Sequence, residues 1–153
     1  MYRIAANFYK DFYIYEDDIL LMTAKRKYIW FAGVRVKVFL VNDKLLLAYR
    51  YFSFFYTFLK IKYQNLPYEV QIDRKWGNIA FKVNNHRIYC NLSSLPHRKM
   101  GQIKIDGKEV AIITNKKIFG SSLEFKLEFV EKSEFEIYCI LLFLMNISAV
   151  ESF

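Results

Sequence analysis

The 153-residue sequence contains few of the residues that interrupt regular structure or cross-link small domains, with only 5 Gly, 2 Pro and 2 Cys. So little glycine and proline argues against a disordered or repetitive chain, and the length suits one domain with its own core. Cys90 and Cys139 provide no disulfide framework, so we expect two buried, reduced thiols. No apolar segment follows Met1-Tyr2-Arg3, so we find no secretory signal and expect a cytoplasmic protein.

Residues and motifs for catalysis are also scarce. The sequence has two histidines, His86 and His97, and it has no G-x-S-x-G motif, phosphate-binding loop or dinucleotide fingerprint. Cys90 follows His86 by four residues on the same face of an expected strand, about 13 Å away, which is too far for proton transfer. No Cys/His spacing suits zinc, and Asp17-Asp18 alone offers too few oxygen ligands for calcium. We therefore expect a non-enzymatic protein with no cofactor and no metal.

Aromatic residues are abundant, at 19% of the chain, and with Val and Ile they favour β-strands. Alternation of apolar and polar residues is clearest over 34–41, which predicts a strand with one buried face. Turn residues separate many such segments. We expect turns at Asp17-Asp18, Asn42-Asp43-Lys44, 74–78, Asn84-Asn85, Asp106-Gly107, 115–117 and 120–122. Ten to twelve short antiparallel strands follow, which indicates a mainly β fold, either a sandwich or a closed barrel.

Only the end of the chain predicts a helix. Residues 137–150 form a 14-residue apolar run without charge, and Ser133-Glu134-Phe135-Glu136 before it matches a capping box. A helix over about 134–148 would be roughly 22 Å long, which is short of a bilayer core of about 30 Å. Its N-terminal flank is acidic and lacks the Lys/Arg cluster that orients a membrane anchor. We therefore expect a buried core helix and no transmembrane span.

A β-meander that ends in one apolar helix resembles the tubby C-terminal-like superfamily, which includes tubby proteins, phospholipid scramblases and LURP-one-related proteins. The resemblance rests on the terminal segment FEIYCILLFLMNIS and on the hairpins IKIDGKEVAIITNKK and VRVKVFLVNDKLLLAYR. It extends over nearly the whole chain, 1–153, as a layout of elements. It implies about twelve antiparallel strands closed into a barrel around the hydrophobic C-terminal helix. It also favours a function that involves membrane lipid. The calcium-binding acidic loop, the cysteine-rich tract and the phosphoinositide-binding strand of these families have no counterpart in this sequence.

Positive charge is unevenly distributed along the chain. The net charge is +8, with 22 Lys/Arg against 11 Asp/Glu in residues 1–130 and an acidic remainder. Such a positive field attracts phosphate-bearing partners such as anionic membrane or nucleic acid.

Two basic clusters dominate our choice of site. Residues 25–27 form an apparent turn followed by aromatic residues, and Arg35 and Lys37 project from one face of the next expected strand. These segments should be neighbours in a meander, which would make a basic and aromatic site for phosphates or lipid headgroups. Secondary clusters are Arg74-Lys75-Trp76 and His97-Arg98-Lys99. The candidate ligand-binding residues are Lys25, Arg26, Lys27, Arg35, Lys37, Arg98 and Lys99.

The leading hypothesis is a β-barrel module that binds anionic phospholipid or a membrane surface through basic loops, and three alternatives compete with it. The charges on turns are in the simplest case only solvated, and they then keep the protein in solution. The aromatic run Tyr49–Phe58 (YRYFSFFYTF) is aromatic on both faces, which suits core packing or a surface for a protein partner or self-association. Nucleic-acid binding is the third alternative, and it would show a steep salt dependence.

Overall fold

Twelve antiparallel strands and one C-terminal helix make up the fold, as expected. The computed structural model describes residues 1–7, 11–29, 33–53, 57–75, 78–92, 99–119 and 122–150. The elements are β1 (Tyr2–Asn7), β2 (Phe12–Glu16), β3 (Ile19–Ile29), β4 (Gly33–Leu40), β5 (Leu45–Ser53), β6 (Thr57–Gln64), β7 (Val70–Lys75), β8 (Asn78–Val83), β9 (His86–Leu92), β10 (Lys99–Ile105), β11 (Lys108–Phe119), β12 (Ser122–Phe129) and α1 (Glu136–Val150).

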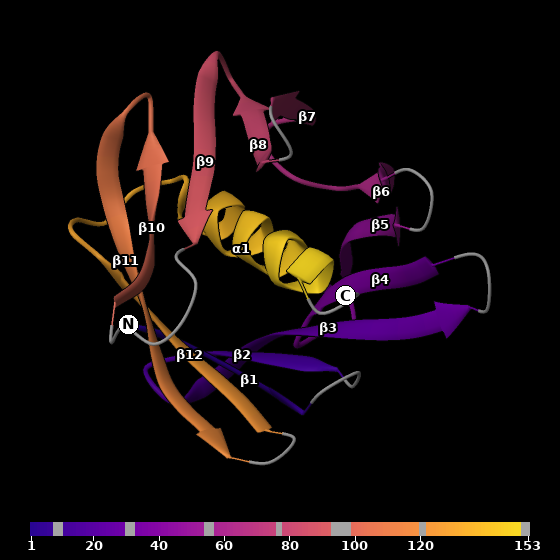
Figure 1. The fold of residues 1–153 in the computed structure, drawn as a ribbon, viewed down its shortest axis with the longest axis horizontal. Helices are drawn as coiled ribbons and strands as arrows, with labels where there is room; N and C mark the ends of the chain where they lie inside the picture. Colours follow the sequence, from indigo (N-terminus) through magenta and orange to yellow (C-terminus); the bar gives the residue numbers. More distant parts are fainter. Residues whose placement is uncertain are drawn as a thin grey trace.

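The strands form one sheet that curls into a nearly closed barrel (Figure 1). Strands consecutive in the chain pair with each other, except β6 and β7, and β1 pairs with β12, which gives the order β6-β5-β4-β3-β2-β1-β12-β11-β10-β9-β8-β7. The sheet therefore ends at β6 and β7, which are consecutive in the chain but have no ladder between them among the described residues. The barrel is a meander with one seam.

Local turn chemistry sets several of the hairpins. Asp17, Asp18, Asn84 and Asn85 all have positive φ angles, as does the pair Asp106-Gly107 at 50° and 86°. Asp, Asn and Gly accept this left-handed backbone more readily than other residues, and two such residues in succession make the type I′ turn that suits hairpins. These turns are confirmed where the sequence predicted them.

Two expected turns are wrong. Residues 25–27 lie inside β3, an 11-residue strand, and not in a turn. Residues 115–117 lie inside β11, where a register shift between Asn115 and Lys117 marks a β-bulge against β12. In both segments polar residues run through a paired strand, because long strands in a barrel carry an outer face that tolerates charge.

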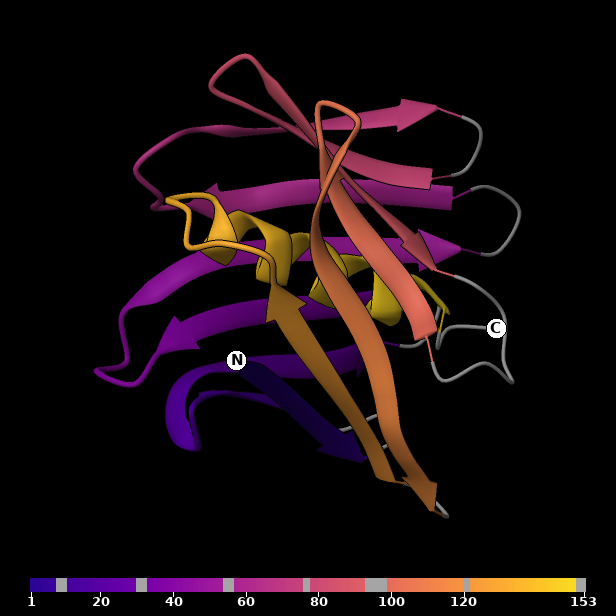
Figure 2. The same cartoon turned by 90° about the vertical axis from the view of Figure 1, so that its left-hand side faces the viewer.

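Helix α1 lies along the inside of the barrel (Figures 1 and 2), so its apolar sides all meet inward-facing strand residues. From Tyr138 to Met145 every residue is buried, and most are fully inaccessible. Asn146, directly after this stretch, donates a hydrogen bond from Nδ2 to the Leu142 carbonyl at 2.9 Å, so this donor is satisfied within the helix. The expected core helix is confirmed, shifted by two residues to Glu136–Val150. No described helix is long and apolar enough to cross a membrane.

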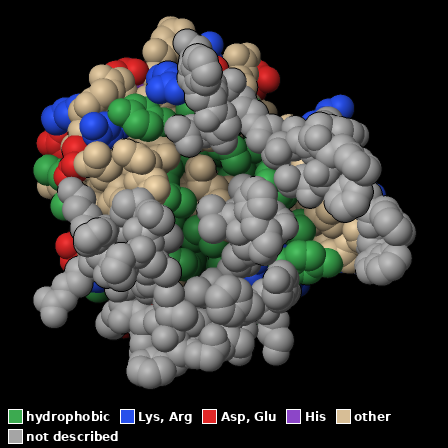
Figure 3. Space-filling model, viewed as in Figure 1, with side chains coloured by type: hydrophobic (Ala, Val, Ile, Leu, Met, Phe, Trp, Pro, Cys, Tyr) green, Lys and Arg blue, Asp and Glu red, His purple; other side chains and the backbone are tan. Residues whose placement is uncertain are grey.

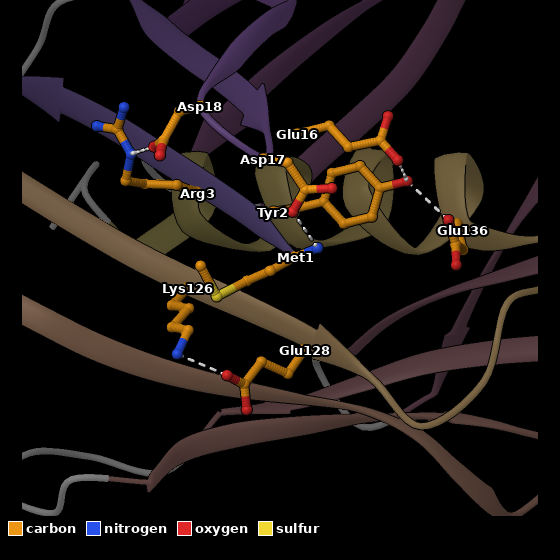
Figure 4. A network of polar contacts seen from close by, with 9 residues as sticks. All are labelled: Met1, Tyr2, Arg3, Glu16, Asp17, Asp18, Lys126, Glu128 and Glu136. Carbon is orange, nitrogen blue, oxygen red and sulfur yellow. Dashed lines mark hydrogen bonds and ion pairs between the residues drawn. The ribbon is translucent and has the colours of Figure 1, made fainter.

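The start of the helix is fixed by contacts to the barrel wall (Figure 4). Glu136, in the first turn, accepts a hydrogen bond at 2.6 Å from the phenol of Tyr2 on β1, and Glu16 lies 3.3 Å from the same phenol. Burial, followed by these two carboxylates, raises the pKa of Tyr2, so the phenol stays a donor. The Ser133 hydroxyl accepts from the Phe135 amide at 3.1 Å. The predicted capping box is thus only half present, because the Glu136 carboxylate is bonded to Tyr2.

Candidate functional site

The outer surface of β3–β6 carries a cluster of positive charge, which we call the cationic face. Its members alternate along each strand with inward residues of the core, such as Ala24, Val36 and Tyr49, all at most 2% exposed. Side chains that alternate with buried ones must point to solvent. The cationic face consists of Lys25 and Lys27 on β3, Arg35 and Lys37 on β4, Arg50 on β5, and Lys60 and Lys62 on β6.

The sheet register brings these cations together in rows. Lys27 is the partner of Arg35, Arg35 of Arg50, and Arg50 of Lys60, so four cations lie side by side across four strands. One step along, Lys25 is the partner of Lys37. Neighbouring strands are about 4.8 Å apart and every second residue about 6.6 Å, so the face is a compact grid of charge.

Carboxylates are scarce around this grid. Within the described chain, none of Lys25, Lys27, Arg35, Lys37, Lys60 and Lys62 forms an ion pair, and the ammonium of Lys25 lies 5.3 Å from the Phe39 ring. Asp11, just before β2, does not neutralise a side chain of the face, because its carboxylate accepts the Arg26 backbone N–H at 3.0 Å. Like charges directly opposite one another destabilise a sheet. Repulsion within the cationic face therefore lowers the stability of the fold, and a bound external anion would reduce this repulsion.

The whole net charge of the protein comes from this region. Residues 19–64 contain nine Lys/Arg and one Asp/Glu, whereas the rest of the chain contains fourteen of each. The single acid, Asp43, lies in the turn between β4 and β5, outside the paired strands.

Four of the predicted site residues meet in the cationic face, namely Lys25, Lys27, Arg35 and Lys37. Arg26 does not, because it is the inward residue between two outward lysines. Arg26 is only 9% exposed, and its guanidinium carbon lies 4.0 Å from the centre of the Phe12 ring. The prediction that Arg26 belongs to the binding site was wrong, because adjacent residues of a strand point to opposite faces of the sheet.

The cluster around residues 97–99 does not join the face. Lys99 begins β10, which is separated from β3 by four strands in the sheet order, and Arg98 lies outside the described residues. Arg74 and Lys75 end β7, across the seam from β6.

Sequence reasoning missed Arg50, Lys60 and Lys62. The available signal was alternation: Tyr49 and Tyr51 are both 2% exposed, so Arg50 between them points outward. That run of aromatic residues is therefore core on its Tyr49 side, while residues 54–56 lie outside the described residues. Placing Lys60 opposite Arg50 also needed the β5–β6 register, which includes a shift after Ala48.

Elsewhere the outer surface mixes both signs of charge. Arg87 pairs with Asp73 at 3.2 Å, Lys126 with Glu128 at 2.6 Å, and Arg3 lies 3.7 Å from Asp18. Figure 3 shows basic and acidic groups next to each other at the upper left, over the region of β9–β11.

A polar hollow of about 330 Å³ lies among the described residues at the turn ends of β7–β9. In it His86 Nδ1 lies 2.6 Å from an Asp106 carboxylate oxygen, and the Arg87 N–H donates to the other oxygen at 2.9 Å. The Arg87 N–H and then His86 hold the pKa of Asp106 below its usual range. The Asp106 carboxylate thus has two partners within the protein, and the Arg87 guanidinium pairs with Asp73, so the hollow is a weaker candidate than the cationic face.

The two cysteines are free and buried, and burial raises the pKa of both Cys90 and Cys139 to about 12. Neither is therefore a thiolate at neutral pH, and neither suits nucleophilic catalysis. The described residues contain no group of three His, Cys, Asp or Glu that could hold a metal ion.

Comparisons with known proteins add no identification. No family model matches the sequence, and neither a curated protein nor a solved structure is significantly similar to the chain. The geometry of the cationic face alone must therefore support a function.

Proposed function

We propose that this protein is a non-enzymatic barrel module that binds anionic membrane surfaces through the cationic face. The observation that carries the proposal is the row Lys27–Arg35–Arg50–Lys60, four cations on four adjacent strands. Lys27 and its partner Arg35, like Lys25 and its partner Lys37, form no ion pair within the described chain, and like charges opposite one another lower the stability of a sheet. A surface of anionic headgroups would neutralise all of them together.

The magnitudes favour a membrane. Each Lys or Arg close to an anionic leaflet contributes about 1 kcal/mol, so the seven cations of the face are sufficient for reversible attachment. Anionic lipids are concentrated in the cytoplasmic leaflet, so the proposal is of a peripheral protein on the cytoplasmic side of the membrane. The interaction occurs through strands, and not through the basic loops expected from the sequence.

The composition of the face also favours lipid over nucleic acid. Five of its seven cations are lysines, which are point charges on flexible stems. Such groups suit a fluid array of headgroups better than fixed base edges, for which bidentate Arg is the usual reader.

The architecture supports a related proposal about ancestry. Twelve antiparallel strands around a buried C-terminal helix are the layout of the tubby C-terminal-like superfamily, and we include this chain as a divergent member in the proposal. Membership would agree with a role at membranes, but the membrane proposal rests on the cationic face.

Cosedimentation with vesicles tests the proposal directly. We expect the protein to sediment with vesicles of phosphatidylcholine mixed with phosphatidylserine, and not with phosphatidylcholine alone. The triple variant Lys25→Glu/Lys27→Glu/Lys37→Glu should bind about a hundredfold more weakly, because three favourable contacts of about 1 kcal/mol each are lost.

The matched control, Lys82→Glu/Lys104→Glu/Lys108→Glu, makes the same charge change on strands β8, β10 and β11. Its affinity for the anionic vesicles should fall less than about fivefold, since charges farther from the membrane than a Debye length are screened. Equal losses in both triple variants would contradict the proposal, as would equal binding to both vesicle types. Duplex DNA binding tighter than vesicle binding would replace it with nucleic-acid recognition.

A further inference from the structure

The seam of the barrel is the second unusual feature of the molecule. Strands β6 and β7 end the sheet on its two sides, and each has a hydrogen-bonded neighbour on one side only within the described residues. Figure 1 shows them next to each other around the barrel, farther apart than the paired strands. Edge strands with unpaired N–H and C=O groups are templates for another strand.

One side chain bridges the seam at one end. The amide of Gln64, the last residue of β6, accepts the Val70 N–H at 2.7 Å and donates to the Val70 carbonyl at 3.1 Å. It makes the two bonds that a neighbouring strand would make to the first residue of β7. A side chain reaches farther than a backbone, so β6 and β7 are here beyond ladder distance.

Helix α1 fixes the loop next to this bridge. The Tyr138 hydroxyl accepts the Tyr68 N–H at 2.7 Å and lies 3.3 Å from the Tyr68 carbonyl. The spacing of the seam at this end is therefore set by the core, which keeps the two edges apart.

Side chains along the seam have two characters. On β6, Lys60 and Lys62 point outward and are exposed, while Leu59 and Ile61 point inward and are only partly buried. Ile72, inward on β7, is also only partly buried. Val36 and Ile113, inward residues in the middle of strands paired on both sides, are fully inaccessible. The seam thus leaves apolar surface incompletely covered on the inside and positive charge on the outside.

We propose that the β6 edge accepts an extended peptide segment of a partner protein, in which acidic residues alternate with apolar ones. Its backbone would add to the ladder of β6, its apolar side chains would cover Leu59 and Ile61, and its acidic side chains would meet Lys60 and Lys62. This is β-strand addition, in which main-chain bonds give affinity and alternate side chains give specificity. The inference goes beyond membrane binding and does not depend on it.

Two other occupants fit the edge less well. Pairing β6 with β6 of a second copy about a two-fold axis would bring its lysines toward the same lysines of the partner, and like charges opposite one another are unfavourable. A lipid acyl chain would cover the apolar residues but leave the edge N–H and C=O groups without partners, at a cost for each buried group.

An eight-residue peptide of alternating Glu and Val, the length of β6, is the probe, with both ends blocked. Added to the isotope-labelled protein, it should slow hydrogen exchange of edge amides in β6 and shift their NMR signals. A peptide with Lys in place of Glu should bind at least about tenfold more weakly, because its charges repel Lys60 and Lys62.

Two controls separate strand addition from simple charge attraction. N-methylation of the alternate peptide amides that face β6 removes the ladder bonds and leaves the charges unchanged, so it should abolish binding. Lys60→Glu/Lys62→Glu should weaken binding, while Lys25→Glu/Lys37→Glu on the other side of the cationic face should change it less than about threefold.

Several results would overturn the proposal. These are equal binding of the N-methylated peptide, equal loss in the two double variants, or no effect on β6 amides at saturating peptide. The substitutions that test vesicle binding lie on β3 and β4, whereas those that test peptide binding lie on β6. Failure of the membrane proposal can therefore be distinguished from failure of the peptide proposal.

Discussion

The outer surface of this barrel has two regions with opposite treatment of charge. On β3–β6 the cations are partners of other cations, as in Lys27–Arg35 and Lys25–Lys37. On the remaining strands the register also places Arg3 opposite Lys126 and Lys82 opposite Arg87. A carboxylate lies beside each of those two pairs, as in Arg87–Asp73 and Lys126–Glu128. Paired charge needs no explanation beyond folding and solvation, whereas a grid of like charge lowers stability and calls for a ligand. The difference identifies the site without any motif, and variants in each region can test it.

The largest effect is expected at Arg26, which belongs to the same three-residue basic segment but lies inside the barrel. Arg26→Ala removes the guanidinium over Phe12 and the packed stem, and should lower the free energy of unfolding by about 2 kcal/mol. Urea denaturation measures this change. Vesicle binding by the folded variant should equal that of the wild type, because Arg26 does not belong to the cationic face. If Arg26→Ala loses as much vesicle binding as the Lys25, Lys27 and Lys37 variant, the assignment of binding to the outward residues alone is contradicted.

A smaller effect, with opposite sign in the two regions, is expected for single changes to glutamate. Arg35→Glu places a carboxylate between Lys27 and Arg50, so it should stabilise the protein by about 1 kcal/mol while weakening vesicle binding. Lys108→Glu, opposite Ile105 in the register, breaks the pair with Glu131 and should destabilise the protein by about 0.5 kcal/mol. Thermal unfolding at low salt measures both changes. If Arg35→Glu destabilises the protein, repulsion within the cationic face is not significant.

Much of the fold could be predicted because its signals are local. Asp17-Asp18, Asn84-Asn85 and Asp106-Gly107 favour left-handed backbone by themselves, so hairpins follow from neighbouring residues. The apolar run of α1 requires an apolar surrounding, which a meander of alternating strands supplies. The seam between β6 and β7 gives no such signal, because closure depends on the sum of twist and stagger over all twelve strands.

The site was only partly predictable for the same reason. Lys25, Lys27, Arg35 and Lys37 lie in one hairpin, so their meeting follows from sequence neighbours. The cluster of basic residues suggested a turn, but β3 continues through it and sends Arg26 inward. Predicting that Lys60 belongs to the cationic face requires the register of the β5–β6 hairpin, including its bulge. That register depends on the packing of the whole sheet.

The smallest effect is expected from pH, and it distinguishes the two regions again. Asp106 lies in the paired region, and its contacts with the Arg87 N–H and with His86 lower its pKa in the folded protein. A lowered native pKa means that the unfolded chain binds the proton more readily, so stability from this carboxylate is present above its ordinary pKa and is lost as the pH falls toward the native value. Asp106→Asn should therefore be less stable than the wild type at neutral pH, and the difference should shrink on acidification. Arg35→Gln, on the cationic face, leaves the Asp106 carboxylate and its contacts intact, so the difference between this variant and the wild type should show no such convergence. Tm values of the three proteins across acidic pH measure this, and parallel curves for the wild type and Asp106→Asn would show that the turn, and not the carboxylate charge, provides the stability.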